Sequence, residues 1–237
     1  MELKRVVVTG LGAVTPVGNN PEETWKNLLE GVSGAAPITH FDASQFKTQF
    51  ACEVKGFNVN DYIDRKEARK MDRYAQLAMA SAVQAVEDSK MDLESVDKNR
   101  IGIWGWSYGG FNTLMSMSEG RGVFRAGVAI APPTNWKFYD SVYTERYMRT
   151  PKENPDGYAT NPIERASKLH GALLICHGTA DDNVHPQNAY EYSEALVQAD
   201  KDFRELYYTN RNHSIYGGNT RNHLLRQVAQ FFQTELR

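Results

Sequence analysis

One serine, one acid and one histidine occur in an order and a setting that could support nucleophilic catalysis. Ser107 lies in Gly105-Trp-Ser-Tyr-Gly109, between an apolar run at 101–106 and a helical pattern that continues to about residue 118. Small residues at both ends of such a pentapeptide permit a sharp strand-to-helix turn that exposes the hydroxyl. A serine hydroxyl is a weak nucleophile unless a base lies beside it. The alternative is a glycine-rich turn whose serine has no catalytic role. The residues further along the chain decide between these two interpretations.

The acid and the base follow in the chain order typical of α/β-hydrolases. Asp181 comes after the apolar run at 172–177, and His213 comes after the run at 203–209. Because the carboxyl ends of parallel strands meet at one edge of a sheet, both side chains are expected beside Ser107. Spacing alone does not separate Asp181 from Asp182. The other histidines are expected to be surface or satisfied structural residues: His40, His170, His177, His185 and His223.

The segments that must position these residues alternate between strand and helix patterns. Apolar runs at 101–106, 124–131, 172–177 and 203–209 predict strands, and helices are expected at 108–118, at 187–199 and from about 220. Such alternation indicates a mostly parallel, helix-covered sheet and therefore an α/β fold. Upstream, the sequence predicts a strand at 5–9 and helices at 21–29 and 71–89. The polar stretch 91–100 separates two domains, 1–98 and 99–237.

Composition excludes several classes of function. The 237 residues carry a formal net charge of −2, with acidic and basic residues mixed along the chain, which argues against nucleic-acid or membrane partners. No run is long enough for a membrane span or a signal-peptide core, so the chain as written is expected in the cytoplasm. Cys52 and Cys176 show no metal-ligand spacing, so they are expected to be buried structural thiols. We expect no cofactor and no metal.

A nucleotide-binding reading of the first residues is discounted. Val8-Thr-Gly10-Leu-Gly12-Ala-Val-Thr15 has two of the glycines of a dinucleotide-binding turn, but Thr15 stands where the third is required.

Three motifs in the second half resemble the dipeptidyl peptidase IV branch of the prolyl oligopeptidases. They are Gly-Trp-Ser-Tyr-Gly-Gly, His-Gly-Thr-Ala-Asp-Asp-Asn-Val-His and Asp-Ser-Val-Tyr-Thr-Glu-Arg-Tyr-Met, and the resemblance runs from about residue 100 to the C-terminus. It implies a partial α/β-hydrolase fold with Ser107 as the nucleophile, Asp181 as the orienting acid and His213 as the base. It also implies a role in substrate or oxyanion binding for a further set of residues: Tyr108, Trp136, Tyr139, Tyr143, Asn183 and Val184.

The first hundred residues resemble the start of a β-ketoacyl-acyl-carrier-protein synthase II. The resemblance rests on Arg5-Val-Val-Val-Thr-Gly-Leu-Gly-Ala-Val-Thr-Pro-Val-Gly18, Gly31-Val-Ser-Gly and Asp64-Arg-Lys-Glu-Ala-Arg-Lys-Met-Asp-Arg73. It implies a thiolase-like fragment without that family's catalytic cysteine and histidines, and it carries no role onto Cys52. The chain therefore reads as a chimera joined near 97–104.

The function expected from these features is hydrolysis of peptide or small ester bonds after proline or alanine, through an acyl-enzyme. The resemblance implies weakened activity, because the family's β-propeller and the tyrosine that supplies its second oxyanion donor are not seen in this sequence. Two alternatives remain: a catalytically inert fusion or scaffold, and a relative of the 3-oxoacyl-carrier-protein synthases that lacks their catalytic residues.

Overall fold

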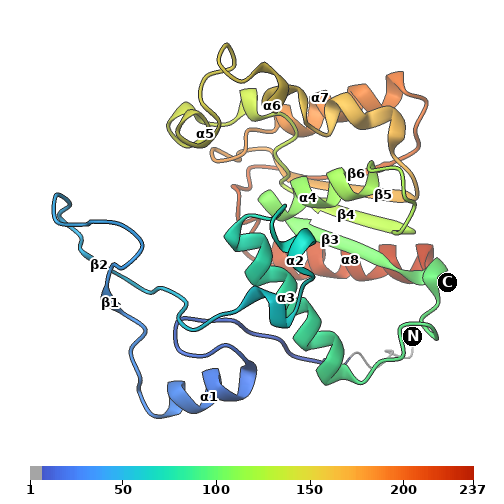
Figure 1. Ribbon diagram of the computed structural model, residues 1–237. Coiled ribbons are helices and arrows are strands. Elements are labelled where there is room, and N and C mark those ends of the chain that lie inside the picture. Colours follow the sequence, from blue (N-terminus) through green and yellow to red (C-terminus); the bar gives the residue numbers. More distant parts are fainter. Residues whose placement is uncertain (1–6) are drawn as a thin grey trace. The chain divides into compact units, whose positions relative to one another are not determined.

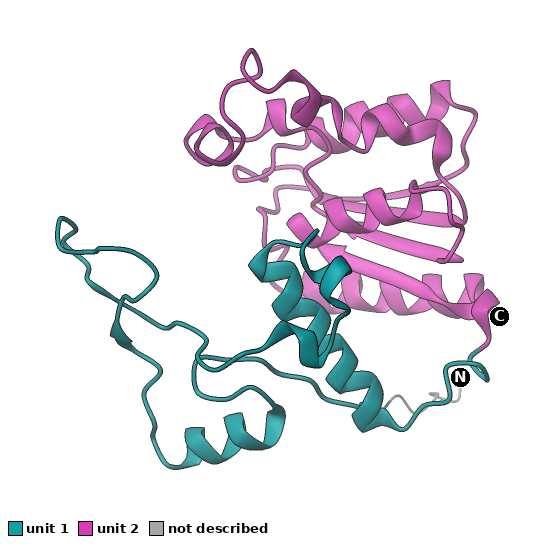
Figure 2. Ribbon diagram, viewed as in Figure 1, with its two compact units in different colours: residues 1–96 teal, residues 97–237 magenta. Residues whose placement is uncertain are grey.

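The computed structural model describes residues 7–237, and the chain divides into two compact units, Met1–Val96 and Asp97–Arg237 (Figure 2). The division lies two residues before the domain boundary predicted from the sequence.

The second unit is built on a four-stranded parallel sheet. Its strands are β3 (Gly102–Trp106), β4 (Ala126–Ile130), β5 (Ala172–Gly178) and β6 (Arg204–Tyr208), hydrogen-bonded in the order β3-β4-β5-β6 (Figure 1). Trp106 is in register with Ile130, and Ile130 with Cys176, so the carboxyl ends of the first three strands finish together. Each strand lies within two residues of its predicted range, and the predicted α/β class is confirmed.

Helices cover both faces of this sheet. On one face, α4 (Tyr108–Met117) and α7 (Gln187–Gln198) pack Leu114, Met117 and Tyr192 against Ile175 (Figure 1). On the other face, α8 (Thr220–Glu235) packs Leu224 and Phe231 against Val128. Strand β4 is buried at every position, as expected for a central strand covered on both sides.

The connection from β4 to β5 contains short helices that the sequence patterns did not predict. They are the 3₁₀ helices η3 (Trp136–Phe138) and η4 (Ile163–Lys168) and the α-helices α5 (Ser141–Met148) and α6 (Pro155–Ala159). Another 3₁₀ helix, η2 (Lys98–Arg100), precedes the first strand of the sheet. Asp140 caps α5 by accepting a hydrogen bond from the Tyr143 amide. This cap fixes the start of the helix that carries the Tyr143 side chain.

The regular structure of the first unit consists mostly of helices, and long irregular segments connect them. It contains α1 (Pro21–Leu29), the two-residue strands β1 (Ala36–Pro37) and β2 (Phe50–Ala51), η1 (Val59–Asp61), α2 (Arg65–Ala68) and α3 (Arg73–Ser89). Gln84 of α3 ties the unit together, since its amide nitrogen donates to Asn19 O at 2.7 Å and to Tyr62 Oη at 2.9 Å. A Cβ on Gly12 would stand 1.8 Å from Ser81 O, so this glycine serves close packing against α3.

Two expectations for the first unit are wrong in the structure. Residues 7–9 of the predicted strand 5–9 belong to no strand, and Val8 is 81% exposed; residues 5 and 6 lie outside the described range. A β-branched run forms a strand only where a neighbour accepts its backbone hydrogen bonds, and no strand pairs with residues 7–9. Cys52 is exposed because it follows a two-residue strand with little packed over it, whereas Cys176 is buried as predicted.

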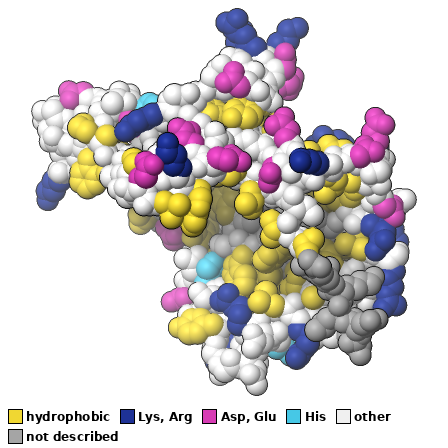
Figure 3. Space-filling view, turned by 90° about the horizontal axis from the view of Figure 1, so that it is seen from below, with side chains coloured by type: hydrophobic (Ala, Val, Ile, Leu, Met, Phe, Trp, Pro, Cys, Tyr) yellow, Lys and Arg dark blue, Asp and Glu magenta, His cyan; other side chains and the backbone are white. Residues whose placement is uncertain are grey.

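Within residues 7–237, no helix combines the length and apolar character that a bilayer crossing needs. Figure 3 shows Lys and Arg side chains interspersed with Asp and Glu on the face it presents.

Candidate active site

Ser107 occupies a strained turn between β3 and α4. Its φ is 59° and its ψ −121°, a conformation that a residue with a side chain seldom adopts. The Ser107 amide donates to Ile130 O at 2.8 Å, which anchors the turn to the neighbouring strand. Gly105 and Gly109 approach so closely that a Cβ on Gly105 would lie 2.1 Å from Gly109 O. The turn therefore has the geometry of a nucleophile elbow.

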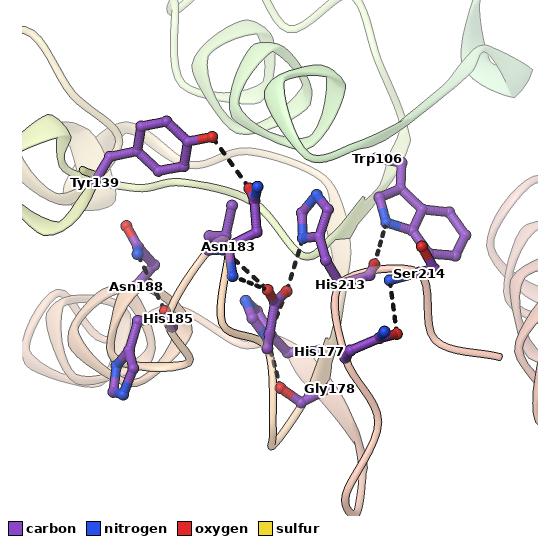
Figure 4. Close-up of polar contacts among 12 residues, drawn as sticks. Trp106, Tyr139, His177, Gly178, Asn183, His185, Asn188, His213 and Ser214 are labelled. Carbon is purple, nitrogen blue, oxygen red and sulfur yellow. Dashed lines mark hydrogen bonds and ion pairs between the residues drawn. The ribbon is translucent and has the colours of Figure 1, made fainter. Parts of the chain in front are cut away.

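Asp181 is almost completely buried, and both of its carboxylate oxygens are engaged. Oδ1 accepts from the backbone amides of Asn183 at 3.0 Å and Val184 at 2.9 Å, and Oδ2 accepts from His213 Nδ1 at 2.8 Å (Figure 4). Asp182, by contrast, is exposed. Of the two adjacent acids that spacing did not separate, Asp181 is the one in contact with His213.

His213 lies in the loop after β6, with about a quarter of its side chain exposed. Its Nδ1 faces Asp181, so the hydrogen bond favours the tautomer whose Nε2 can accept a proton. The indole Nε1 of Trp106, the residue before Ser107, donates to His213 O at 3.0 Å (Figure 4). Among the described residues, the structure records the acid–base hydrogen bond of the predicted triad and none from Ser107 Oγ to the imidazole. Such bonds often tighten only when substrate is bound.

Two hydrogen bonds, one between backbone groups and one to a side chain, hold the loops of the acid and the base against each other. The Ala180 amide donates to Arg211 O at 3.1 Å, and the Asn210 amide donates to Thr179 Oγ1 at 2.9 Å. The Asp181–His213 pair therefore rests on joined loops at the carboxyl ends of β5 and β6.

A cavity of about 210 Å³ opens beside Ser107. It is lined by Ser107, Tyr108, Pro133, Trp136, Tyr139 and Tyr143. The Trp136 ring lies 5.3 Å from Tyr108 and 6.0 Å from Tyr139, centroid to centroid, so flat rings form its walls. Four of the predicted binding residues are thus brought together with the serine.

The two other predicted binding residues lie elsewhere. Val184 is fully buried and does not line the cavity, and its amide supports Asp181. Asn183 also does not line it, but its Oδ1 accepts from Tyr139 Oη at 3.1 Å (Figure 4). Because this bond uses the side-chain oxygen of Asn183, its side-chain amide nitrogen remains as the group that can donate a hydrogen bond. Burial, more than nearby Asp140, raises the pKa of Tyr139, so its hydroxyl stays protonated and able to donate.

Two residues that support the site, Pro133 and Asn188, were not predicted from the sequence, and a third, His177, was expected only among the surface or structural histidines. Pro133 forms part of the cavity wall. Buried Asn188 accepts from the Thr134 amide at 2.8 Å and donates to His185 O at 3.1 Å, which ties the aromatic segment to the loop of the acid. His177 is completely buried, with its Nδ1 3.0 Å from Gly178 O and 3.9 Å from Asp181 Oδ2. Burial lowers its pKa, which keeps the ring neutral.

No group of three or more His, Cys, Asp or Glu side chains in the described part of the chain is placed to hold a metal ion.

Comparisons with known proteins identify the family of the chain. The family model described as "Prolyl oligopeptidase family" matches residues 66–237, which is most of the chain. The chain belongs to the prolyl oligopeptidase family. The match starts at residue 66, inside the first unit.

Individual relatives carry peptidase names. The chain is 45% identical over 142 residues to "Dipeptidyl peptidase 4" of Bos taurus, an alignment that covers 58% of this chain and 19% of the relative. It is 34% identical over 230 residues to "Probable dipeptidyl-aminopeptidase B" of Coccidioides posadasii, covering 91% of this chain and 25% of the relative. The crystal structure of Porphyromonas gingivalis dipeptidyl peptidase 4 is 54% identical, with a TM-score of 0.60, over 66% of this chain and 22% of that one. The chain thus spans a fifth to a quarter of these prolyl oligopeptidase relatives.

Proposed function

We propose that this chain is a serine hydrolase that cleaves peptide or small ester bonds through a Ser107 acyl-enzyme. The main support for the proposal is the Asp181–His213 hydrogen bond of 2.8 Å. It occurs together with a serine, Ser107, held in a strained strand-to-helix turn. Membership of the prolyl oligopeptidase family supports it.

In the proposed mechanism, His213 Nε2 takes the hydroxyl proton as Ser107 Oγ attacks the acyl carbon. Asp181 holds the imidazolium that results and fixes its orientation. The Tyr108 amide, at the N-terminus of α4, is the proposed donor to the developing oxyanion. His213 then gives the proton to the leaving amine or alkoxide as the acyl–leaving-group bond breaks. Water attacks the ester of Ser107 in the second half, with His213 again as base.

The aromatic cavity is the proposed site for the side chain before the scissile bond. Its flat aromatic walls of Trp136, Tyr139 and Tyr143 suit a compact apolar ring such as the pyrrolidine of proline, and its volume of about 210 Å³ leaves room for it. Alanine would also enter, with less apolar surface buried and hence weaker binding. Asn183 is the proposed donor to a substrate carbonyl, with its amide oriented by Tyr139.

The origin of the first unit is a separate proposal. The motifs at 5–18, 31–34 and 64–73 support descent from a β-ketoacyl-acyl-carrier-protein synthase II, and hence a chimeric chain. We expect no malonyl-carrier condensation, because Cys52 is exposed beside a short hairpin and no motif assigns it a nucleophile's role. Condensation that disappears in Cys52→Ser would contradict this.

The hydrolase proposal is tested with p-nitrophenyl acetate, Gly-Pro-p-nitroanilide and acetyl-Gly-Pro-p-nitroanilide. We expect weak ester hydrolysis that is lost in Ser107→Ala, and slower cleavage of both anilides. None of the six residues lining the cavity carries a carboxylate that could pair with a free α-amine, so acetylation should change anilide cleavage little.

Trp136→Ala separates binding from chemistry in the same assays. It removes the largest wall of the cavity, so it should slow anilide cleavage much more than acetate hydrolysis. Ester turnover that persists in Ser107→Ala would contradict the proposed function and favour an inert scaffold.

A further inference from the structure

The loop that carries His213 has little regular structure to hold it. Between β6 and α8 it contains several residues with positive φ: Asn210, Ile215, Gly217 and Gly218. Asp181 fixes one ring nitrogen of His213 but no part of its backbone. The distance from the imidazole to Ser107 therefore depends on what holds the main chain of this loop.

Two side chains hold three consecutive carbonyl groups of the loop. Trp106 Nε1 donates to His213 O at 3.0 Å. The guanidinium of Arg221, in the first turn of α8, donates through Nη2 to Ser214 O and through Nε to Ile215 O at 3.4 Å. Because a guanidinium carries several donors in a fixed plane, one side chain can hold two neighbouring carbonyls.

The same two side chains also contact each other. The Arg221 guanidinium carbon lies 4.6 Å from the centre of the Trp106 ring, which is cation–π distance. Trp106 directly precedes Ser107 and packs against the hydrophobic core beneath the sheet, and buried Ile215 anchors the loop in that same core. A continuous set of contacts thus runs from the backbone of the nucleophile, through Trp106 and Arg221, to the backbone of the base.

We infer that Arg221 is a positioning residue for catalysis, which together with Trp106 fixes His213 at a defined place relative to Ser107. This rests on the proposed function, since it assigns the pair a role in the same serine–histidine site. Arg221 acts through the loop backbone and does not touch substrate. A base held in this way is oriented before substrate binds, so losing the guanidinium should slow proton transfer without weakening substrate binding.

The test measures the rate at which a fluorophosphonate labels Ser107, together with kcat and KM for p-nitrophenyl acetate, in Arg221→Met, Arg221→Lys and the control Arg226→Met. Arg226 lies on the same helix and is exposed, so its removal changes the net charge equally without touching the loop. Arg221→Met should lower the labelling rate and kcat about tenfold to a hundredfold with KM little changed, because small displacements of a reacting group cost that much. Arg221→Lys, which keeps the charge but not the paired donors, should recover only part of the rate.

Trp106→Phe completes the design, because it keeps an aromatic ring beneath Arg221 but removes the indole donor to His213 O. If the two residues act as one unit, the loss in the double variant should be smaller than the product of the two single losses. The far-downfield proton resonance of the Asp181–His213 hydrogen bond should broaden or shift in Arg221→Met, a change that lower stability alone would not produce in a folded sample.

The two possible failures are distinguishable. If wild-type Ser107 is labelled and Arg221→Met is labelled at the same rate, the role of Arg221 is wrong while the proposed function stands. If wild-type Ser107 is not labelled in a folded sample, the proposed function itself is wrong.

Discussion

The carbonyl oxygen of Gly109 lies 2.1 Å from the point where a Cβ of Gly105 would stand. No side chain fits between β3 and α4 at that point, so the turn that presents Ser107 exists only with glycine at 105. We predict that Gly105→Ala lowers the free energy of unfolding by about 1–3 kcal/mol. It should also abolish fluorophosphonate labelling of Ser107, because the turn must open to admit the methyl group. Urea denaturation followed by far-UV circular dichroism, with labelling in parallel, measures both.

Gly109→Ala is the matched control for stability. A Cβ on Gly109 would meet nothing within 4 Å, and the residue lies inside α4, where alanine is the better helix former. Its free energy of unfolding should be equal to or higher than that of the wild type. Equal destabilisation by the two alanines would show that the turn is not packed as described.

Asp181 and Asp182 offer a comparison of adjacent acids. In Asp181→Asn, a side-chain amide would face His213 Nδ1 and favour the tautomer that cannot accept the proton of Ser107. The Ser107 labelling rate should fall by roughly 10⁴-fold. Asp182→Asn changes an exposed side chain and should be labelled at nearly the wild-type rate. A larger loss in Asp182→Asn would reverse the assignment of the acid.

The three proposed triad residues could be predicted from the sequence because each follows its own strand. Ser107 comes directly after one apolar run, and Asp181 and His213 each come a few residues after another. The parallel pairing of the strands brings their carboxyl ends to one edge. The sequence could not predict the contacts that hold the site, because Arg221, Asn188 and Pro133 act through tertiary contacts that no local pattern records. The strand predicted at 5–9 failed for the same reason. Its β-branched residues favour a strand, but the neighbouring strand that would accept their backbone hydrogen bonds is a tertiary feature that the local sequence does not determine.

The two cysteines should differ sharply in reactivity. Burial raises the pKa of Cys176 to about 12, so its thiol is protonated at pH 8 and closed to reagents, whereas Cys52 is exposed. We predict rapid modification of Cys52 by a maleimide in the native protein, and modification of Cys176 only in denaturant. Mass spectrometry of the labelled peptides distinguishes them. Equal native labelling of both would mean that β5 is not buried as described.

His177 should make stability depend on pH. Burial lowers the pKa of this ring below its ordinary value of 6.5, and the opposing effect of Asp181 is smaller. Below about pH 6.5 the unfolded chain therefore binds a proton that the folded chain does not, and stability falls with pH by up to about 1.4 kcal/mol per unit. Urea midpoints between pH 7.5 and 5 should decline less steeply in His177→Asn, whose amide can replace the donor to Gly178 O.

His185→Asn is the control for this pH dependence, because it removes an exposed histidine from the same segment. It should retain the steep decline of the wild type. If His177→Asn and the wild type lose stability in parallel as the pH falls, the ring is not held neutral by burial.

The nucleophilic role of Ser107 is tested most directly by mapping the site of reaction with a fluorophosphonate. The folded protein is incubated with the reagent, digested and sequenced by tandem mass spectrometry, with Ser107→Ala and His213→Ala treated alongside. We expect one adduct, on Ser107, which is absent from Ser107→Ala and strongly reduced in His213→Ala because the hydroxyl has lost its base. An adduct on another serine, or labelling of Ser107 at the same rate without His213, would contradict it.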